Sequence, residues 1–423
     1  SGIGLGAAGD GTPDGYAVNA TTYAGVLFGL DNNTTQDINV DLFSGGGDII
    51  INGKSSYASA GYAIQTYQGY AFDAGEDGDI TMHGYSDSTG VSSVGFDLGS
   101  FRGETGGHSV IRTKNGNILL DGYARNGASE SIGIAIDGGT TKRISIEATG
   151  TGSVTLRGDA AGTGASALRL GGLDVLAASG DIQLLSDSGR IWSIDIISGA
   201  GVNIGQKAGS SVTTSTSDVL IKTPDSIHFG TVVDITTDGG NAIAWASTDG
   251  GNVDGYVYLA DGSSITTGGG HVWLGGSTSK ATPGTLVGDG TTTWNGLTVG
   301  NGYAVSGSGV TVPNGPDWRA GIGLANANIA TGGGDFYAAG MDLNTVGGGA
   351  GGGSGIVHGG TNGSINAGSG SIEMNAYSGA SGAYAMLIGV HPNGVDNSLT
   401  LSSSSNDTTA IALAAETAST DAN

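Results

Sequence analysis

The chain has no cysteine, few prolines and very little positive charge. None of its 423 residues is Cys, which excludes disulfide frameworks, thiolate metal sites and thiol catalysis. Only 6 residues are Pro, and no apolar run is long enough to span a bilayer. The 14 Lys and Arg residues stand against 38 Asp and Glu, giving a formal net charge of −24. Because nucleic acids and anionic membranes attract basic surfaces, we expect no nucleic-acid binding and no membrane insertion.

Glycine and regularly spaced apolar residues dominate the rest of the chain. Gly accounts for 85 residues, and 37% of the chain is hydrophobic. The apolar residues recur in alternating pairs, so a core can form where a patternless Gly-rich chain would stay disordered. The chain begins at Ser1 and shows no recognisable signal peptide. We therefore expect a mature or excised fragment that is part of a longer chain or fibre.

A short repeated segment is the most informative pattern. Each copy has Gly, a turn residue, two apolar residues separated by one other residue, and often a closing Gly. Copies begin at Gly47, Gly78, Gly116, Gly152 and Gly180, and later ones at Gly270, Gly334 and Gly370. Successive early copies are roughly 30–38 residues apart, which is typical of repeat architectures. The period-two alternation within each copy predicts a β-strand with one buried face.

Two further strand patterns recur with the same spacing. One reads Ser, any residue, a small residue, apolar, any, apolar, and occurs at residues 59–64, 93–98 and 131–136. The other is a short strand before the Gly motif, as at residues 38–40, 144–146 and 173–175. Gly-rich corners join the three strands, and two-residue hairpin turns are scarce. About three strands per repeat predict a triangular coil whose strands pair in parallel with those of the next coil.

Stacked coils would place equivalent apolar residues in columns. The expected columns run through Ile49, Ile80, Ile118 and Val154, and through Ile51, Met82, Leu120 and Leu156. Gly would supply corners with positive φ. The sequence thus predicts an all-β parallel β-helix, or β-solenoid, over residues 1–423. An irregular insertion is expected around residues 281–320, where three prolines fall, and a weakly patterned tail at residues 407–423.

A longer pattern recurs in the second half of the chain. It reads Ile, two further residues, three Gly, then Asp or His, and an apolar residue. It occurs at residues 265–274 and 329–336, and a related stretch covers 244–256. On these residues the chain resembles the filamentous haemagglutinin type of large exported repeat proteins of Gram-negative bacteria, which two-partner systems secrete. The resemblance covers nearly the whole chain. It implies a right-handed β-helix, an extracellular location at the bacterial surface and an adhesive or structural role.

One polar position recurs directly after the first Gly of the motif. It is occupied by Asp48, Asp79, Asn117, Ser153 and Asp181. A row of carboxylates would suit acid–base cleavage of a polysaccharide or Ca²⁺ binding. Asn and Ser at the same position favour a structural role, since such residues stabilise corners through local hydrogen bonds. The His residues show no metal-ligand spacing, and we expect no catalytic residue, no metal site and no cofactor.

Two other groups are candidates for ligand binding. Arg157, Gly158 and Asp159 resemble the cell-binding tripeptide of some adhesins, although they also fit an ordinary corner at the end of a strand. Trp273 and Tyr337 fall at outward positions between two inward apolar residues. Exposed rings at these positions would stack on sugars, and a loop that covers them is the alternative.

The leading hypothesis is a structural and adhesive rod, without enzymatic activity, that supports adhesion, aggregation or biofilm contact. Its partners would be cell-surface glycans or proteins, or further copies of itself. One alternative is a subunit that stacks end to end into an extracellular filament or surface layer. The other is a β-helical polysaccharide-cleaving enzyme, which requires a groove lined by acids.

Overall fold

A computed structural model describes most of the chain, as two compact units. The described residues are 17–19, 24–29, 40–66, 69–99, 109–125, 127, 129–140, 142–162, 165–193, 201–207, 214–215, 217–251, 255–306, 319–343, 353–379, 384–389 and 398–418. Unit 1 is Ser1–Thr214 and unit 2 is Ser215–Asn423. All regular elements of the described residues are β-strands, which confirms the predicted all-β class. No helix in these ranges could cross a membrane.

Unit 1 contains three parallel sheets. The first has the strand order β1 (Ala17–Asn19), β4 (Ile49–Ser55), β7 (Ile80–Ser86), β10 (Ile118–Ala124), β13 (Val154–Ala160) and β16 (Ile182–Ser186). The second has β2 (Ala24–Phe28), β5 (Ala60–Thr66), β8 (Ser92–Gly99), β11 (Glu130–Asp137), β14 (Ser166–Gly171) and β17 (Arg190–Ser193). The third has β3 (Val40–Phe43), β6 (Tyr70–Asp73), β9 (Ser109–Thr113), β12 (Ile144–Ala148), β15 (Leu173–Ala177) and β18 (Val202–Ile204).

Unit 2 repeats this arrangement. Its first sheet has β20 (Val219–Lys222), β23 (Ala242–Trp245), β26 (Val272–Gly275), β32 (Phe336–Asp342), β35 (Ile372–Ser378) and β38 (Ile411–Thr417), and β29 (Ala304–Ser306) also pairs with β32. The second has β21 (Ile227–Phe229), β24 (Val257–Leu259), β30 (Ala320–Ala325), β33 (Ser354–Gly359) and β36 (Met386–Ile388). The third has β22 (Val233–Asp238), β25 (Ser264–Thr266), β31 (Asn328–Ala330), β34 (Gly363–Asn366) and β37 (Leu399–Ser402). β19 (Thr214–Ser215) lies where unit 1 ends and unit 2 begins.

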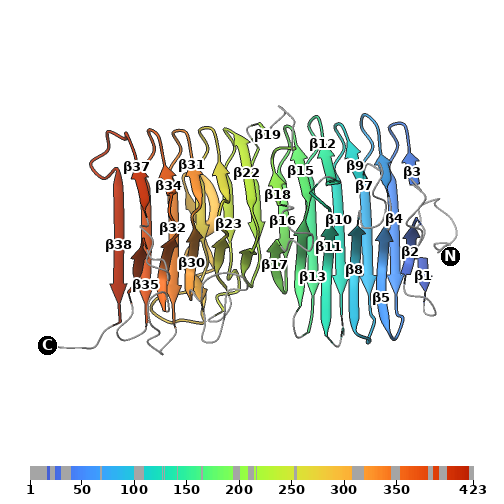
Figure 1. The fold of residues 1–423 in the computed structure, drawn as a ribbon, viewed down its shortest axis with the longest axis horizontal. Coiled ribbons are helices and arrows are strands. Elements are labelled where there is room, and N and C mark those ends of the chain that lie inside the picture. The colour runs from blue at the N-terminus through green and yellow to red at the C-terminus, as the bar shows by residue number, and fades with distance from the viewer. Residues whose placement is uncertain are drawn as a thin grey trace. The chain divides into compact units, whose positions relative to one another are not determined.

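Each unit is a right-handed parallel β-helix, as predicted. The chain visits the third, first and second sheets in turn, so three strands make one coil. Every strand then pairs with its counterpart in the neighbouring coil, and within each unit these counterparts lie side by side (Figure 1). This pairing satisfies the backbone hydrogen bonds between coils.

The apolar columns expected from the sequence are present in unit 1. Ile49 lies opposite Ile80, and Ile51 lies opposite Met82, in the register of β4 and β7. The same two columns continue along β10 and β13 through the predicted residues, Ile118 and Leu120, then Val154 and Leu156. All of these side chains are buried. The period-two pattern was therefore sufficient to give both the buried face and the register.

Glycine has two separate roles. At Gly269, φ is +126°, a conformation that L side chains rarely adopt, so the prediction of positive-φ corners is confirmed there. Gly122 lies inside strand β10 instead. A Cβ at Gly122 would lie 2.2 Å from the carbonyl oxygen of Gly133 on β11. Glycine at this position lets the first and second sheets approach each other closely.

The predicted insertion contains a β-hairpin. β27 (Thr291–Trp294) and β28 (Leu297–Gly300) pair antiparallel, unlike the strands of the coils. Residues 307–318 of the predicted insertion lie outside the described residues. Within the predicted tail, β38 pairs in parallel with β35. A single solenoid that is continuous over residues 1–423 stays a prediction.

Candidate functional site

The tripeptide Arg157, Gly158 and Asp159 lies inside strand β13, not at the corner expected from the sequence. Arg157 Nε and Nη2 donate to the two carboxylate oxygens of Asp121, at 2.8 and 2.6 Å. Asp159 accepts a hydrogen bond from Ser188 Oγ. A Cβ at Gly158 would lie 2.0 Å from the carbonyl oxygen of Ala167, so this glycine permits close packing rather than a turn. Both charged groups are engaged within unit 1.

Asp121 is the centre of a charged column on the outer face of unit 1. His83 Nδ1 lies 3.2 Å from Asp121 Oδ2, on the side opposite Arg157 in the strand order. Burial by itself would raise the pKa of Asp121, but hydrogen bonding and charge from Arg157, together with His83, lower it below its usual value. Asp121 is therefore held as a carboxylate. An ionised, paired carboxylate of this kind is not suited to act as a general acid.

Trp273 is buried, so the predicted exposure of its ring, which a sugar contact would need, is wrong. It occupies the outward position of β26, as the alternation predicted, but its side chain is only 1% exposed. The hairpin folds over it, and Trp294 and Val299 of the hairpin belong to the same apolar cluster. Tyr337 on β32 is half-buried and stacks on Trp273, with ring centroids 6.0 Å apart and an interplanar angle of 6°.

The recurring polar position forms a continuous row in unit 1, which we call the polar ladder. The main-chain N–H of Asp79 donates to Asp48 Oδ1 at 2.9 Å, and that of Asn117 donates to Asp79 Oδ1 at 2.6 Å. The N–H of Ser153 donates to Asn117 Oδ1, and that of Asp181 to Ser153 Oγ, both at 3.1 Å. The structural role is confirmed, but each bond joins two coils and is not local to one corner.

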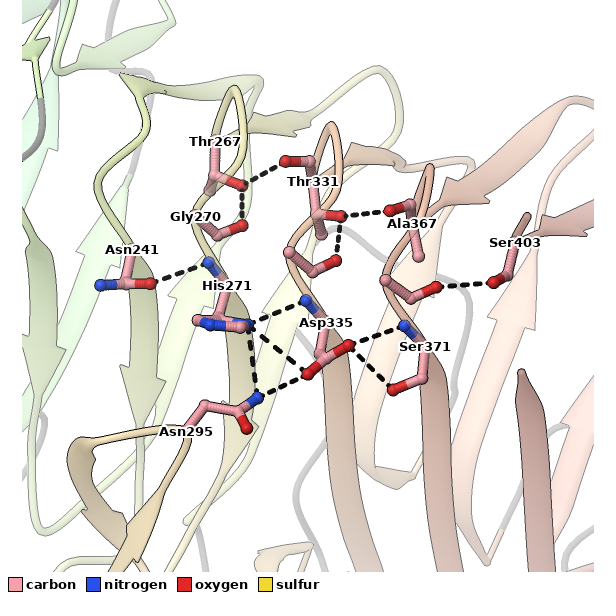
Figure 2. A network of polar contacts seen from close by, with 12 residues as sticks. Asn241, Thr267, Gly270, His271, Asn295, Thr331, Asp335, Ala367, Ser371 and Ser403 are labelled. Carbon is pink, nitrogen blue, oxygen red and sulfur yellow. Dashed lines mark hydrogen bonds and ion pairs between the residues drawn. The ribbon is translucent and has the colours of Figure 1, made fainter. Parts of the chain in front are cut away.

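Unit 2 has a polar ladder of its own, shown in part in Figure 2. The N–H of Asn241 donates to Asp218 Oδ1 at 2.9 Å, and that of His271 to Asn241 Oδ1 at 2.8 Å. The N–H of Asp335 donates to His271 Nδ1 at 2.9 Å, and that of Ser371 to Asp335 Oδ1 at 2.7 Å. Carboxylate, amide and imidazole groups thus all accept a main-chain N–H from the next coil. This hydrogen bond requires an acceptor atom and not a negative charge.

The hairpin is fastened to this ladder at its turn. Asn295 Nδ2 donates to Asp335 Oδ2 at 2.7 Å and lies 3.3 Å from His271 Nδ1 (Figure 2). Asn295 adopts a φ of 48°, a left-handed conformation that Asn tolerates in turns. The adjacent Trp294 ring meets the His271 ring edge-on at 5.4 Å. The polar ladder therefore positions the hairpin as well as the coils.

A second row of hydroxyl groups stabilises the Gly-rich corners beside the ladder. Thr267 Oγ1 donates to the carbonyl oxygens of Gly270 and Thr331, at 2.5 and 3.2 Å. Thr331 Oγ1 makes the corresponding pair of bonds to Gly334 and, at 3.0 Å, to Ala367 (Figure 2). The carbonyl oxygens of Thr331 and Ala367 also accept the main-chain N–H groups of Gly269 and Gly370, so the hydroxyl groups add to the main-chain bonds at these corners.

The described part of the chain contains no cluster of three or more His, Asp or Glu side chains that could hold a metal ion. A scan against protein-family models, a search of curated proteins and a search of solved structures each gave no match. The resemblance to filamentous haemagglutinin proteins therefore remains an expectation from the sequence motifs.

Sequence reasoning missed the second ladder and the residues around the hairpin. The ladder had a usable signal, because His271, Asp335 and Ser371 directly follow the motif glycines at 270, 334 and 370. Asn295 had no such signal. It lies outside every repeat, and only the folded hairpin brings it to Asp335.

Proposed function

We propose that this chain is a shaft segment of a secreted adhesin at the surface of a Gram-negative bacterium, and that it is not an enzyme. The polar ladder is the observation that carries the proposal. The side chains that looked like a catalytic or Ca²⁺-binding row are instead used to join consecutive coils in both units. A stack reinforced in this way suits a stiff element that holds a binding region away from the cell.

Charge and side-chain chemistry support the same proposal. With a formal charge of −24, the surface disfavours nucleic acid and anionic lipid as partners. Burial raises the pKa of the Asp97 carboxyl group, which also accepts a hydrogen bond from Gln65 at 2.7 Å. A polysaccharide-cleaving site would need such an acid beside a second, open carboxylate. Asp97 instead accepts a hydrogen bond from Gln65, and the neighbouring carboxylate, Glu130, is held in an ion pair with Arg169 and is not open.

Two substitutions of Asp79 test the shaft role of the ladder against an enzymatic role. Asp79→Ala removes the acceptor for the Asn117 N–H and should lower the free energy of unfolding by about 1 kcal/mol. Asp79→Asn keeps an acceptor oxygen, as Asn117 does naturally, and should leave the stability close to that of the wild type. Urea unfolding measures both values.

A second assay incubates the wild type and both variants with a panel of polysaccharides and measures the reducing sugar ends that are released. We expect no release by any of the three proteins. A catalytic ladder would give the opposite pattern, with cleavage by the wild type and its loss in Asp79→Asn despite unchanged stability. That pattern would overturn the proposal.

A further inference from the structure

We propose that His271 makes the fastening of the hairpin sensitive to pH. The neutral ring of His271 holds the turn of the hairpin on the polar ladder, and protonation of the ring releases that turn. The hairpin then opens above Trp273 at mildly acidic pH. This device is independent of the shaft role, because it depends only on contacts within unit 2.

The hydrogen bond from Asp335 fixes the tautomer of His271. The main-chain N–H of Asp335 donates to His271 Nδ1 at 2.9 Å, so Nδ1 carries no proton. The proton of the neutral ring is therefore on Nε2. A second donor, Asn295 Nδ2, lies 3.3 Å from the same Nδ1 (Figure 2). Both the ladder and the hairpin turn thus use the unprotonated Nδ1 as an acceptor.

Protonation of Nδ1 would affect both contacts of Asn295. An imidazolium ring donates from both nitrogens, so the N–H of Asp335 and the amide of Asn295 would face another N–H group. The charged ring would also be attracted to Asp335 Oδ2, which lies 3.7 Å from His271 Nδ1. At present that oxygen accepts a hydrogen bond from Asn295 Nδ2 at 2.7 Å. Proton uptake therefore removes one acceptor of Asn295 and creates a competitor for the other.

The charged groups recorded near His271 are carboxylates. Asp335 on β32 is in contact with the ring. Toward β23 the neighbour is the amide of Asn241, whose Nδ2 donates to Asp218 at 2.7 Å. Asp238 lies beside the Gly corner that precedes His271. The hairpin faces the ring with an uncharged indole and an uncharged amide. A positive charge on the ring would thus be drawn to Asp335, the carboxylate in contact with it.

Asp335 keeps its negative charge over the range in which imidazole groups ordinarily titrate. Burial by itself would raise the pKa of Asp335, but hydrogen bonds from Ser371 and Asn295, together with the charge of His271, lower it below its usual value. Imidazole is the side chain that ordinarily changes charge between pH 5 and 8. Between these pH values, His271 is therefore the partner whose charge changes at this contact.

The hairpin is held separately at its base and at its turn. At the base, Gly276 pairs with Gly302 and Thr278 pairs with Tyr303. These bridges contain no titratable side chain bond and are unaffected by a proton on His271. Loss of the contacts at the turn alone would therefore open the hairpin from its turn, while its base stays paired.

Hydrogen–deuterium exchange of the full chain at pH 8 and pH 5 tests this device. The variant His271→Asn keeps an acceptor oxygen that does not titrate, as Asn241 does in the neighbouring coil. At pH 5 we expect residues 291–300 of the wild type to be about tenfold less protected than those of His271→Asn, and at pH 8 equally protected. Comparing the two proteins at the same pH cancels the pH dependence of chemical exchange. Strand β10 of unit 1 should show no difference at either pH.

Two further variants separate the proposed cause from a general loss of stability. Asn295→Ala removes the contacts of the turn and should leave residues 291–300 poorly protected at both pH values. His83→Asn replaces a histidine of unit 1 and should respond to pH as the wild type does.

Equal protection of the hairpin in the wild type and in His271→Asn at pH 5 would overturn the inference. This result is expected if the edge-on contact between Trp294 and His271 holds the turn whatever the charge of the ring. Should His271→Asn fail to fold, the wild type alone decides. After correction for chemical exchange, its hairpin must lose protection relative to β10 between pH 8 and pH 5, and an unchanged ratio contradicts the device. Neither result bears on the shaft role, which is tested at Asp79 in unit 1.

Discussion

The outer face of the first sheet is built differently in the two units. In unit 1 its side chains lie in open columns and pair along the stack, as Tyr85 does with Tyr123 and Arg157 with Asp121. In unit 2 a hairpin folds over the corresponding face and buries Trp273. The consecutive ladder residues His271 and Asp335 are 64 positions apart in the sequence, because the hairpin is inserted between them.

This difference shows how a regular solenoid acquires a second layer. The coils of both units use the same alternating strands, the same Gly corners and the same polar ladder. One insertion converts an outward aromatic residue into part of a core, and it leaves the neighbouring Tyr337 at the edge of the covered area. The outer faces of the two units therefore differ because of a local insertion and not because of a change of fold.

Removal of the covered aromatic residue should have the largest effect. Trp273→Ala is expected to lower the free energy of unfolding by about 3–5 kcal/mol, because the ring is fully enclosed between Trp245, Tyr337 and the hairpin. Tyr85→Ala on the open face of unit 1 should cost about 1 kcal/mol. Urea unfolding gives both values, and amide hydrogen exchange locates the loss. Equal losses for the two variants would contradict the proposed cover.

The interiors of the two units should also differ in their response to pH. His358 on β33 is 0% exposed and lies in register with Leu324 and Ile388. In unit 1 the corresponding column contains Leu98, Ile136 and Leu170. Burial lowers the pKa of His358 from 6.5 to about 4.

Protonation of His358 favours the unfolded chain, so the free energy of unfolding falls as the pH is lowered. Below pH 6.5 the unfolded chain protonates His358, whereas the folded protein keeps the ring neutral down to about pH 4. Stability is therefore fully present above pH 6.5 and falls by about 3 kcal/mol as the pH approaches 4. Urea unfolding across this range should show the loss in the wild type, and His358→Leu should lack it. Identical pH profiles for the two proteins would show that His358 does not titrate in this way.

The charged column of unit 1 should have the smallest effect. Arg157 is 47% exposed, so solvent screens its ion pair with Asp121. Arg157→Ala is expected to lower the free energy of unfolding by less than about 1 kcal/mol, and the difference should shrink further in 1 M salt. Denaturant titrations at low and high salt measure it. A loss comparable with that of Trp273→Ala would mean that the open face is as important to stability as the covered one.

The sequence predicted the coil in detail. The alternation at Ile49 and Ile51 gave the buried face, and the recurrence of the motif gave the partners Ile80 and Met82. The polar position was also visible, at Asp79 and its equivalents. Its hydrogen bonds were misassigned to local turns, because a spacing in sequence identifies equivalent residues but does not say which atoms meet.

The repeat by itself determined the three strands per coil, the parallel register and the apolar columns, because each depends on short-range alternation that is renewed in every coil. Only the tertiary structure decided that Trp273 is covered, that Arg157 is held by Asp121 and that Asn295 fastens the hairpin to Asp335. Covering Trp273 and fastening Asn295 depend on where an insertion folds back, and no periodic pattern encodes that contact. The direction of an outward side chain can be read from the alternation of a strand, whereas its exposure depends on what packs above it.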